Sequence, residues 1–129
     1  MKRRNLLTTS ASLVGLAALP LAATQAFAQA AYPNKPIKII VPFPAGISPD
    51  VVARLIGDKL AQALGQPVVI DNKPGAGAMI GAEIAATQPA DGYNLLFAVK
   101  SVMAIAPNVY PNAKYNPMKD FKGVAQILL

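Results

Sequence analysis

Short apolar runs alternate with helical patterns along the chain, and this alternation constrains the fold more than any other feature of the sequence. The runs cover residues 37–41, 67–71 and 93–99. The first is a nearly continuous β-branched run between two prolines, as expected of a strand that is buried on both faces. Strands connected by helices in this way form a parallel sheet with helices packed on it. The sequence therefore predicts the α/β fold class.

Two helices are predicted between these strands. The first has Ser48 as its N-cap and Pro49 at the first helical position, and it ends before Gly65. Its apolar side chains recur at helical spacing and are expected to face the sheet. They are Val51, Val52, Leu55, Ile56, Leu60 and Leu64. The second helix is expected over about residues 78–87, after a turn at residues 72–77.

The pattern is weaker after residue 99. Residues 103–110 are compatible with a short helix. Residues 107–117 are rich in proline and asparagine and are expected to form a loop. The apolar run at residues 123–129 is expected to begin another strand.

The first thirty residues have the composition of an export signal. A basic start, Met1-Lys2-Arg3-Arg4, precedes an uncharged stretch over residues 5–24 and two small-x-small triplets that end at Ala28 and Ala30. We predict a signal peptide over residues 1–28, with cleavage near Ala28 or Ala30, and a periplasmic location for the mature chain. The paired arginines also fit a twin-arginine signal, so the general secretion route and the twin-arginine route both remain open.

The composition excludes several kinds of chemistry. The chain has no cysteine and no histidine, which removes disulfides, thiolate chemistry, the usual zinc sites and His-dependent triads. Its lysines are scattered without interleaved aromatic residues, a pattern that argues against nucleic-acid binding. The glycines of residues 75–81 lack the G-x-G-x-x-G spacing, and no phosphate-binding loop motif is present. We therefore predict no nucleic-acid partner, no cofactor, no metal and no catalytic residue.

The predicted topology indicates where a ligand would bind. Ligands of an open parallel sheet bind outside the carboxyl ends of its strands. Three predicted loops leave those ends: residues 42–48, residues 72–77 and the segment from Lys100 onward. The first two lead directly into helix N-termini, whose unpaired N–H groups and partial positive charge favour an anion. Their glycines either bring the backbone close to a ligand or serve only the turns.

Three side chains near these loops are candidates for ligand contact. Asp50 is suited to a ligand's ammonium or hydroxyl group, or serves only as a partner of the helix dipole. Lys100 either neutralises a carboxylate or is a solvated lysine at a strand end. Ser101 either donates to a ligand oxygen or caps the segment that follows. The residues themselves leave each pair of alternatives open.

Seven short motifs follow one another along most of the chain after the signal peptide. They are YPNKPI at residues 32–37, VPFPAG at 41–46, DVVAR at 50–54, LGQPVV at 64–69, NKPGAG at 72–77, PADGY at 89–93 and DF at 120–121. With these motifs, the chain resembles the substrate-binding receptors of tripartite tricarboxylate transporters, also called the Bug family.

That resemblance implies a fold of the periplasmic-binding-protein type (type II), in which two lobes close around a ligand. Residues 31–118 would form most of the first lobe, and residues 119–129 would begin the crossover into the second. The implied function is to capture a small carboxylate and deliver it to the permease subunits of a membrane transporter, without catalysis. The full-length receptor is expected to be monomeric.

The resemblance also implies that loop backbone and ordered water hold the carboxylate. The implied binding residues are Phe43, Ala45, Gly46, Ile47, Ser48, Gly75, Ala76, Gly77 and Ala78, in addition to Asp50, Lys100 and Ser101. The chain departs from the residues common in the family at Ile47, Val99, Met103 and Ala106. Because these departures and Lys100 alter the expected pocket, the resemblance does not identify the ligand.

Other functions remain open. The chain stops inside an apolar run, which is also compatible with a truncated, non-functional product of a receptor gene. A ligand-sensing module, or an exported enzyme with its catalytic residues elsewhere, is a further alternative.

Overall fold

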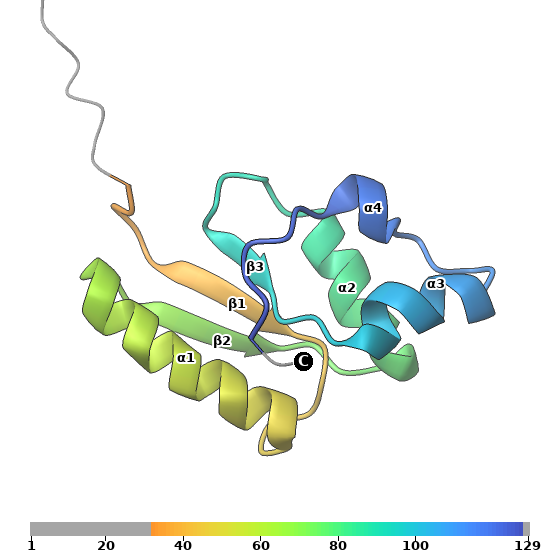
Figure 1. Ribbon diagram of the computed structural model, residues 1–129, viewed down its shortest axis with the longest axis horizontal. Coiled ribbons are helices and arrows are strands. Elements are labelled where there is room, and N and C mark those ends of the chain that lie inside the picture. The colour runs from red at the N-terminus through yellow and green to blue at the C-terminus, as the bar shows by residue number, and fades with distance from the viewer. Residues whose placement is uncertain (1–31, 128–129) are drawn as a thin grey trace, which may run out of the picture.

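The computed structural model describes residues 32–127, and the predicted signal peptide lies outside these described residues. Its sheet has the order β2-β1-β3, and β1 pairs with both neighbours in parallel (Figure 1). The strands are β1 (Ile37–Val41), β2 (Val68–Asn72) and β3 (Asn94–Leu96). The predicted parallel sheet and the bounds of its first strand are confirmed.

The central strand is buried on both faces of the sheet. Ile39 and Val41 pack with Ala53 of the first helix on one face. Ile40, which points to the opposite face, is only 1% exposed. Because both faces are covered, this strand needs no polar alternation, and its β-branched sequence is explained.

Two helices cover opposite faces of this sheet (Figure 1): α1 (Ser48–Leu64) and α2 (Met79–Ala86). The first crossover connects β1 to β2, and the second returns past β1 to β3 on its other side. Crossovers of one hand that run in opposite directions place their helices on opposite faces. The placement of α1 and α2 on opposite faces therefore follows from the strand order.

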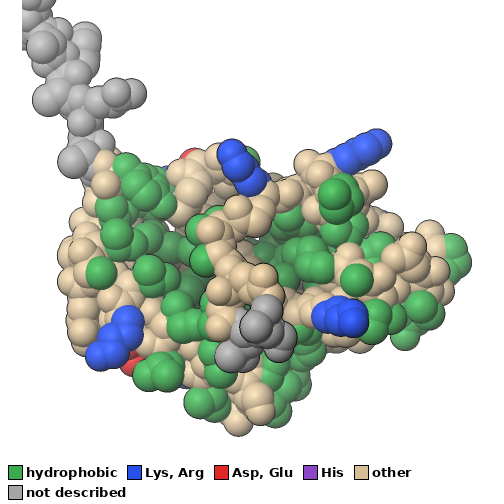
Figure 2. All heavy atoms as spheres, in the orientation of Figure 1, with side chains coloured by type: hydrophobic (Ala, Val, Ile, Leu, Met, Phe, Trp, Pro, Cys, Tyr) green, Lys and Arg blue, Asp and Glu red, His purple; other side chains and the backbone are tan. Residues whose placement is uncertain are grey.

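The side of α1 that faces the sheet differs from the prediction. Its fully buried apolar positions are Ala53 and Gly57, whereas Val51 and Leu55 are 55% and 62% exposed. A Cβ on Gly57 would lie 3.3 Å from Val68 Cγ1 and from Ile70 Cδ1, so the missing side chain lets α1 approach β2 closely. The small residues therefore form the contact, and part of the predicted apolar face remains exposed. Figure 2 shows hydrophobic side chains distributed over this view of the molecule.

The ends of α1 are set by backbone groups. The predicted N-cap at Ser48 is wrong, because Ile47 occupies that position and offers no capping side chain. The carbonyl of Ile47 instead accepts from the N–H groups of Asp50 and Val51. The carboxylate of Asp50 accepts from the N–H of Gly46, which precedes the helix. The predicted end is confirmed: Gly65 is left-handed, with φ of 66°, and its N–H donates to the carbonyl of Ala61.

The third strand is shorter than the predicted run of residues 93–99. Its last hydrogen bond to the central strand joins the N–H of Phe97 to the carbonyl of Ile40. The next position along β1 after Val41 is Pro42, which has no N–H with which to extend the ladder. The chain therefore leaves the sheet before residue 99.

The segment beyond the sheet is helical over more of its length than predicted. A π-helical turn, η2 (Ser101–Ile105), leads into α3 (Ala106–Val109), which confirms the short helix but begins it two residues earlier. The expected loop at residues 107–117 is interrupted by α3 and is followed by α4 (Pro117–Asp120). Residues 123–127 do not form the predicted strand, and the last two residues of that run lie outside the described residues. Among the helices of residues 32–127, none is long and apolar enough to cross a membrane.

A glycine of α2 provides a test of this packing. A Cβ on Gly81 would lie 2.6 Å from Pro42 Cβ and 2.8 Å from the carbonyl oxygen of Lys73. Helix propensity favours alanine over glycine by about 1 kcal/mol, but overpacking costs about 1–3 kcal/mol. We therefore expect Gly81→Ala to lower the melting temperature of the protein. Gly123→Ala is the matched control, because a Cβ there meets no atom within 4 Å. A Gly81→Ala variant that melts at or above the wild-type temperature would contradict this packing.

Candidate functional site

A cavity of about 480 Å³ lies at the carboxyl edge of the sheet. Its lining comes from the segments that follow all three strands, so the three predicted loops do meet at one place. The lining residues are Pro42, Phe43, Pro44, Pro74, Gly75, Gly77, Ala78, Ser101, Ile105, Ala106 and Tyr110.

The wall that follows β2 is a left-handed turn over four consecutive residues. The φ angles of Gly75, Ala76, Gly77 and Ala78 are 131°, 47°, 65° and 74°. Residues other than glycine adopt such angles rarely and at a cost of about 1–3 kcal/mol each, so the two alanines are strained. Ala78 is held in this conformation by burial against Ala82 and Val102. Strain of this kind is concentrated at functional sites.

This turn leads into the N-terminus of α2. The N–H of Ala78 donates to the carbonyl of Gly75, and that of Met79 donates to the carbonyl of Ala76. The N–H of Gly77 has no hydrogen-bond acceptor within residues 32–127. A free N–H beside the positive end of a helix dipole attracts an anion.

Two hydroxyl groups complete the polar part of the cavity. The hydroxyls of Tyr32, Tyr93 and Tyr115 all form hydrogen bonds with other residues. Those of Tyr110 and Ser101 form none in the described part of the chain, and both residues line the cavity. Both hydroxyls can therefore donate to a ligand oxygen.

Asp50 lies behind the cavity wall and organises two of its loops. It is 2% exposed and is not a lining residue. One carboxylate oxygen accepts from Gly46 N–H at 2.8 Å and from Arg54 Nε at 2.9 Å. The other accepts from Asn72 Nδ2 at 2.8 Å, and the same amide donates to the carbonyl of Phe43. The carboxylate therefore ties the loop after β1 to the end of β2.

These hydrogen bonds stabilise the ionised form of Asp50. Donation from Arg54, then from the Gly46 backbone and from Asn72, lowers the pKa of Asp50 from 3.8 to about 2. Of the two roles considered for this acid, the geometry supports a structural one, because internal donors already occupy its oxygens.

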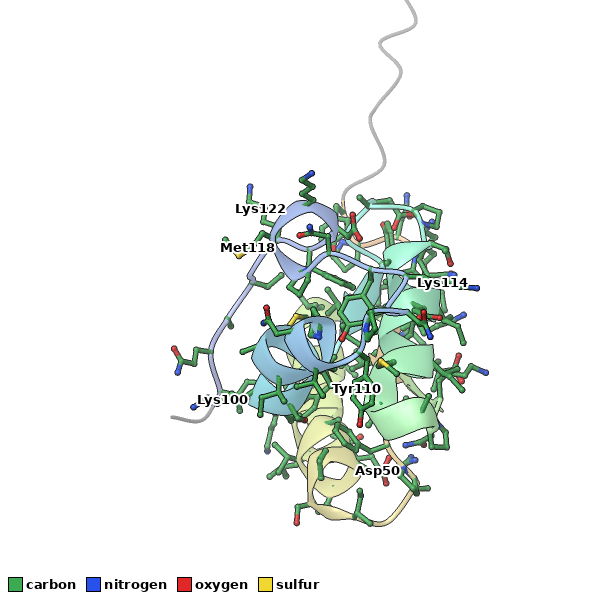
Figure 3. The ribbon with its side chains drawn as sticks, turned by 90° about the vertical axis from the view of Figure 1, so that its right-hand side faces the viewer. Asp50, Lys100, Tyr110, Lys114, Met118 and Lys122 are labelled. Atoms are coloured by element: carbon green, nitrogen blue, oxygen red, sulfur yellow. The ribbon has the colours of Figure 1, made fainter. Side chains whose placement is uncertain are left out.

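The predicted binding residues divide into two groups. Five line the cavity: Phe43, Gly75, Gly77, Ala78 and Ser101. Seven do not: Ala45, Gly46, Ile47, Ser48, Asp50, Ala76 and Lys100. Lys100 is exposed, and Figure 3 shows it projecting away from Tyr110 on the far side of η2. The side chain of Ser101 does not cap η2.

Sequence reasoning missed several apolar lining residues and one polar one. The missed residues are Pro42, Pro44, Pro74, Ile105 and Tyr110, whereas Ala106 had been singled out only as a departure from the family. Tyr110 lies in the segment that follows the third strand, and this segment was expected at the ligand-binding edge of the sheet. That position was the one indication in the sequence that Tyr110 could line the site. In the described residues, no lining side chain is charged, and no group of three or more acidic, cysteine or histidine side chains could hold a metal.

The low pKa of Asp50 predicts how stability depends on pH. Because folding depresses this pKa, ionised Asp50 stabilises the protein above about pH 4, and this contribution is lost as the pH falls towards about 2. Asp50→Asn should therefore melt below wild type at pH 7, and the difference should shrink between pH 4 and pH 2. Melting curves across this range test it, with Asp58→Asn on the exposed side of α1 as the control. An Asp50→Asn variant as stable as wild type at pH 7 would refute the role assigned to the carboxylate.

Comparison with known proteins gives the same fold. Protein BugT of Bordetella pertussis is 42% identical over 97 residues, which are 74% of this chain and 30% of BugT. The solved structure of a periplasmic transporter matches 69% of this chain and 30% of its own, with 49% identity and a TM-score of 0.67. MatC from Rhodopseudomonas palustris with bound malate matches 70% of this chain and 31% of its own, with 37% identity and a TM-score of 0.67. The expected periplasmic-binding-protein fold is confirmed for the matched part, and the chain spans about 30% of the length of BugT.

The model of one family covers more than half of the chain. Residues 52–129 match the family described as tripartite tricarboxylate transporter family receptor. The match begins within α1 and includes both β2 and the left-handed turn of the cavity. This chain therefore belongs to the tripartite tricarboxylate transporter family of receptors.

Proposed function

We propose that this chain forms the ligand-binding part of a periplasmic receptor that captures a small carboxylate for a tripartite transporter. The observation that carries the proposal is the left-handed turn at residues 75–78: Gly77 lines the cavity beside the N-terminus of α2, and its N–H has no acceptor among the described residues. A carboxylate is a small anion with four lone-pair positions, and it fits such a set of donors.

Three donors would hold the carboxylate. The N–H of Gly77 supplies one hydrogen bond, and the free hydroxyls of Ser101 and Tyr110 supply two more. No charged residue is needed, because hydrogen bonds to a carboxylate are strengthened by the ligand's own charge. The malate bound to MatC supports the same class of ligand.

The remainder of the receptor would close the cavity. We assign residues 31–118 to the first of two lobes and residues 119–129 to the start of the crossover into the second. The short span of the chain relative to BugT supports this division. A second lobe would cover the open side of the cavity, exclude water and present the closed receptor to the permease subunits.

The basic and uncharged pattern of residues 1–28 supports export by a signal peptide, and with it a periplasmic location. A receptor that binds, closes and releases needs no catalytic residue or cofactor. The proposal accordingly assigns the full-length protein the role of a monomeric binding protein and not that of an enzyme.

Thermal stabilisation by carboxylates tests the proposal. The full-length mature receptor should melt at a higher temperature with at least one small carboxylate, because a ligand at 100 times its dissociation constant adds roughly 2.7 kcal/mol. Neutral amides of the same acids are the controls, since they keep the shape and lose the charge. Equal shifts with acid and amide, or none with any carboxylate, would refute a carboxylate receptor.

A pair of serine variants tests where the carboxylate binds. Ser101→Ala removes a hydroxyl from the cavity wall, and a hydrogen bond to a charged group contributes about 1.5–3 kcal/mol, so we expect affinity to fall by at least about tenfold. Ser48→Ala removes a hydroxyl that also lies in a predicted loop but outside the cavity lining, and it should leave affinity unchanged. Titration calorimetry measures both. The opposite order of effects would place the carboxylate at the N-terminus of α1 instead.

A further inference from the structure

We infer that the ligand of this receptor is a carboxylate with an apolar, preferably aromatic, body. The inference rests on the proposed function and concerns the part of the ligand beyond the bound carboxylate. It comes from the contrast between the few polar groups of the cavity and the apolar side chains that form the rest of its wall.

The wall beside the anion-binding turn is built from apolar groups. Phe43, Ile105 and Ala106 line it, together with three prolines. Apart from backbone, the polar groups that the described residues bring to it are the hydroxyls of Ser101 and Tyr110. Both are used by the first carboxylate, so the remainder of the ligand meets hydrocarbon wherever it contacts this wall.

A second carboxylate would be poorly accommodated by this wall. Its desolvation is costly unless a cation or several donors replace the lost water. Lys100 points away from Tyr110 (Figure 3), and Arg54 is engaged with Asp50 and Asn72 behind the wall. The described residues therefore supply no cation that faces the cavity.

Tyr110 connects the polar and apolar parts of the site. A Cβ on Gly77 would lie 3.9 Å from its hydroxyl oxygen and 4.0 Å from Cε2, so the phenol lies directly against the left-handed turn. Its hydroxyl and its ring edge therefore both lie beside Gly77, and both residues line the cavity. A ligand whose carboxylate reaches both donors therefore has its body against this ring.

Phe43 provides the other aromatic surface of the wall. It is half-buried and packs against both hydrophobic clusters, one on each face of the sheet. Its carbonyl is held by Asn72, so the residue is fixed from the backbone as well. The fixed ring of Phe43 and the partly exposed ring of Tyr110 favour a ligand with a flat apolar body. Aromatic contacts contribute about 0.5–1.5 kcal/mol to binding beyond the contribution of the buried area.

Titration calorimetry on the full-length mature receptor tests the inference. The probes are phenylacetate, 3-phenylpropionate and cyclohexanecarboxylate on one side, and malate and citrate on the other. We expect at least one of the first three to bind about tenfold or more tightly than either polyacid. Tyr110→Ala should weaken that ligand by about tenfold, as loss of an aromatic contact and a hydrogen bond predicts. Tyr110→Phe, which keeps the ring, should weaken it less.

Each possible result of this experiment bears on a different part of the inference. Tyr110 is 46% exposed, so its replacement should leave the fold intact, and Met118→Ala, at a side chain that is 91% exposed, is the matched surface control. Preference for malate or citrate would overturn this inference and leave the carboxylate receptor standing. If the receptor prefers an apolar acid but Tyr110→Ala does not weaken its binding, the ligand does not contact this wall, and the inference is overturned. Failure of every acid to bind would overturn the proposed function itself.

Discussion

The parallel pairing of β1 on both of its edges is the constraint on which the rest of the structure depends. A strand paired on both sides and covered on both faces is held rigidly, and its end at Val41 fixes where the following loop begins. The same end receives α2, because Gly81 has no side chain to keep the helix from Pro42. One strand therefore determines the positions of the loop after β1 and of the helix whose N-terminus borders the cavity.

Two further features, the buried carboxylate of Asp50 and the strained turn at residues 75–78, position the loops around the cavity. The buried carboxylate of Asp50 joins the loop after β1 to Asn72 at the end of β2, so the two loops are positioned relative to each other. The strained turn at residues 75–78 is maintained because Ala78 is packed into the core. Neither feature contacts the cavity through a charged side chain, and the site remains neutral apart from its backbone dipoles. A site of this kind suits a ligand that brings its own negative charge.

The candidate site could be predicted in outline but not in composition. Gly75 and Gly77 line the cavity. Their place before a helix left open whether they approach a ligand or serve only the turn, and it was the resemblance to the family that implied a binding role. The positive φ of Ala76 could not be predicted, since alanine avoids this region unless its surroundings impose it. Tyr110 was missed for a similar reason: only the path of η2 and α3 brings it back to Gly77.

The sequence by itself determined the order of strands and helices, the parallel sheet, the edge at which the loops meet and the family. These properties depend on local periodicity, turn residues and short motifs, all of which can be seen along the chain. Only the tertiary structure decided that α1 packs through Ala53 and Gly57, that Asp50 faces inward to Arg54 and Asn72, and that Lys100 faces away from the cavity. Each of these depends on contacts between residues from different elements, or on the absence of a Cβ where two elements meet. Such contacts exist only once the chain has folded.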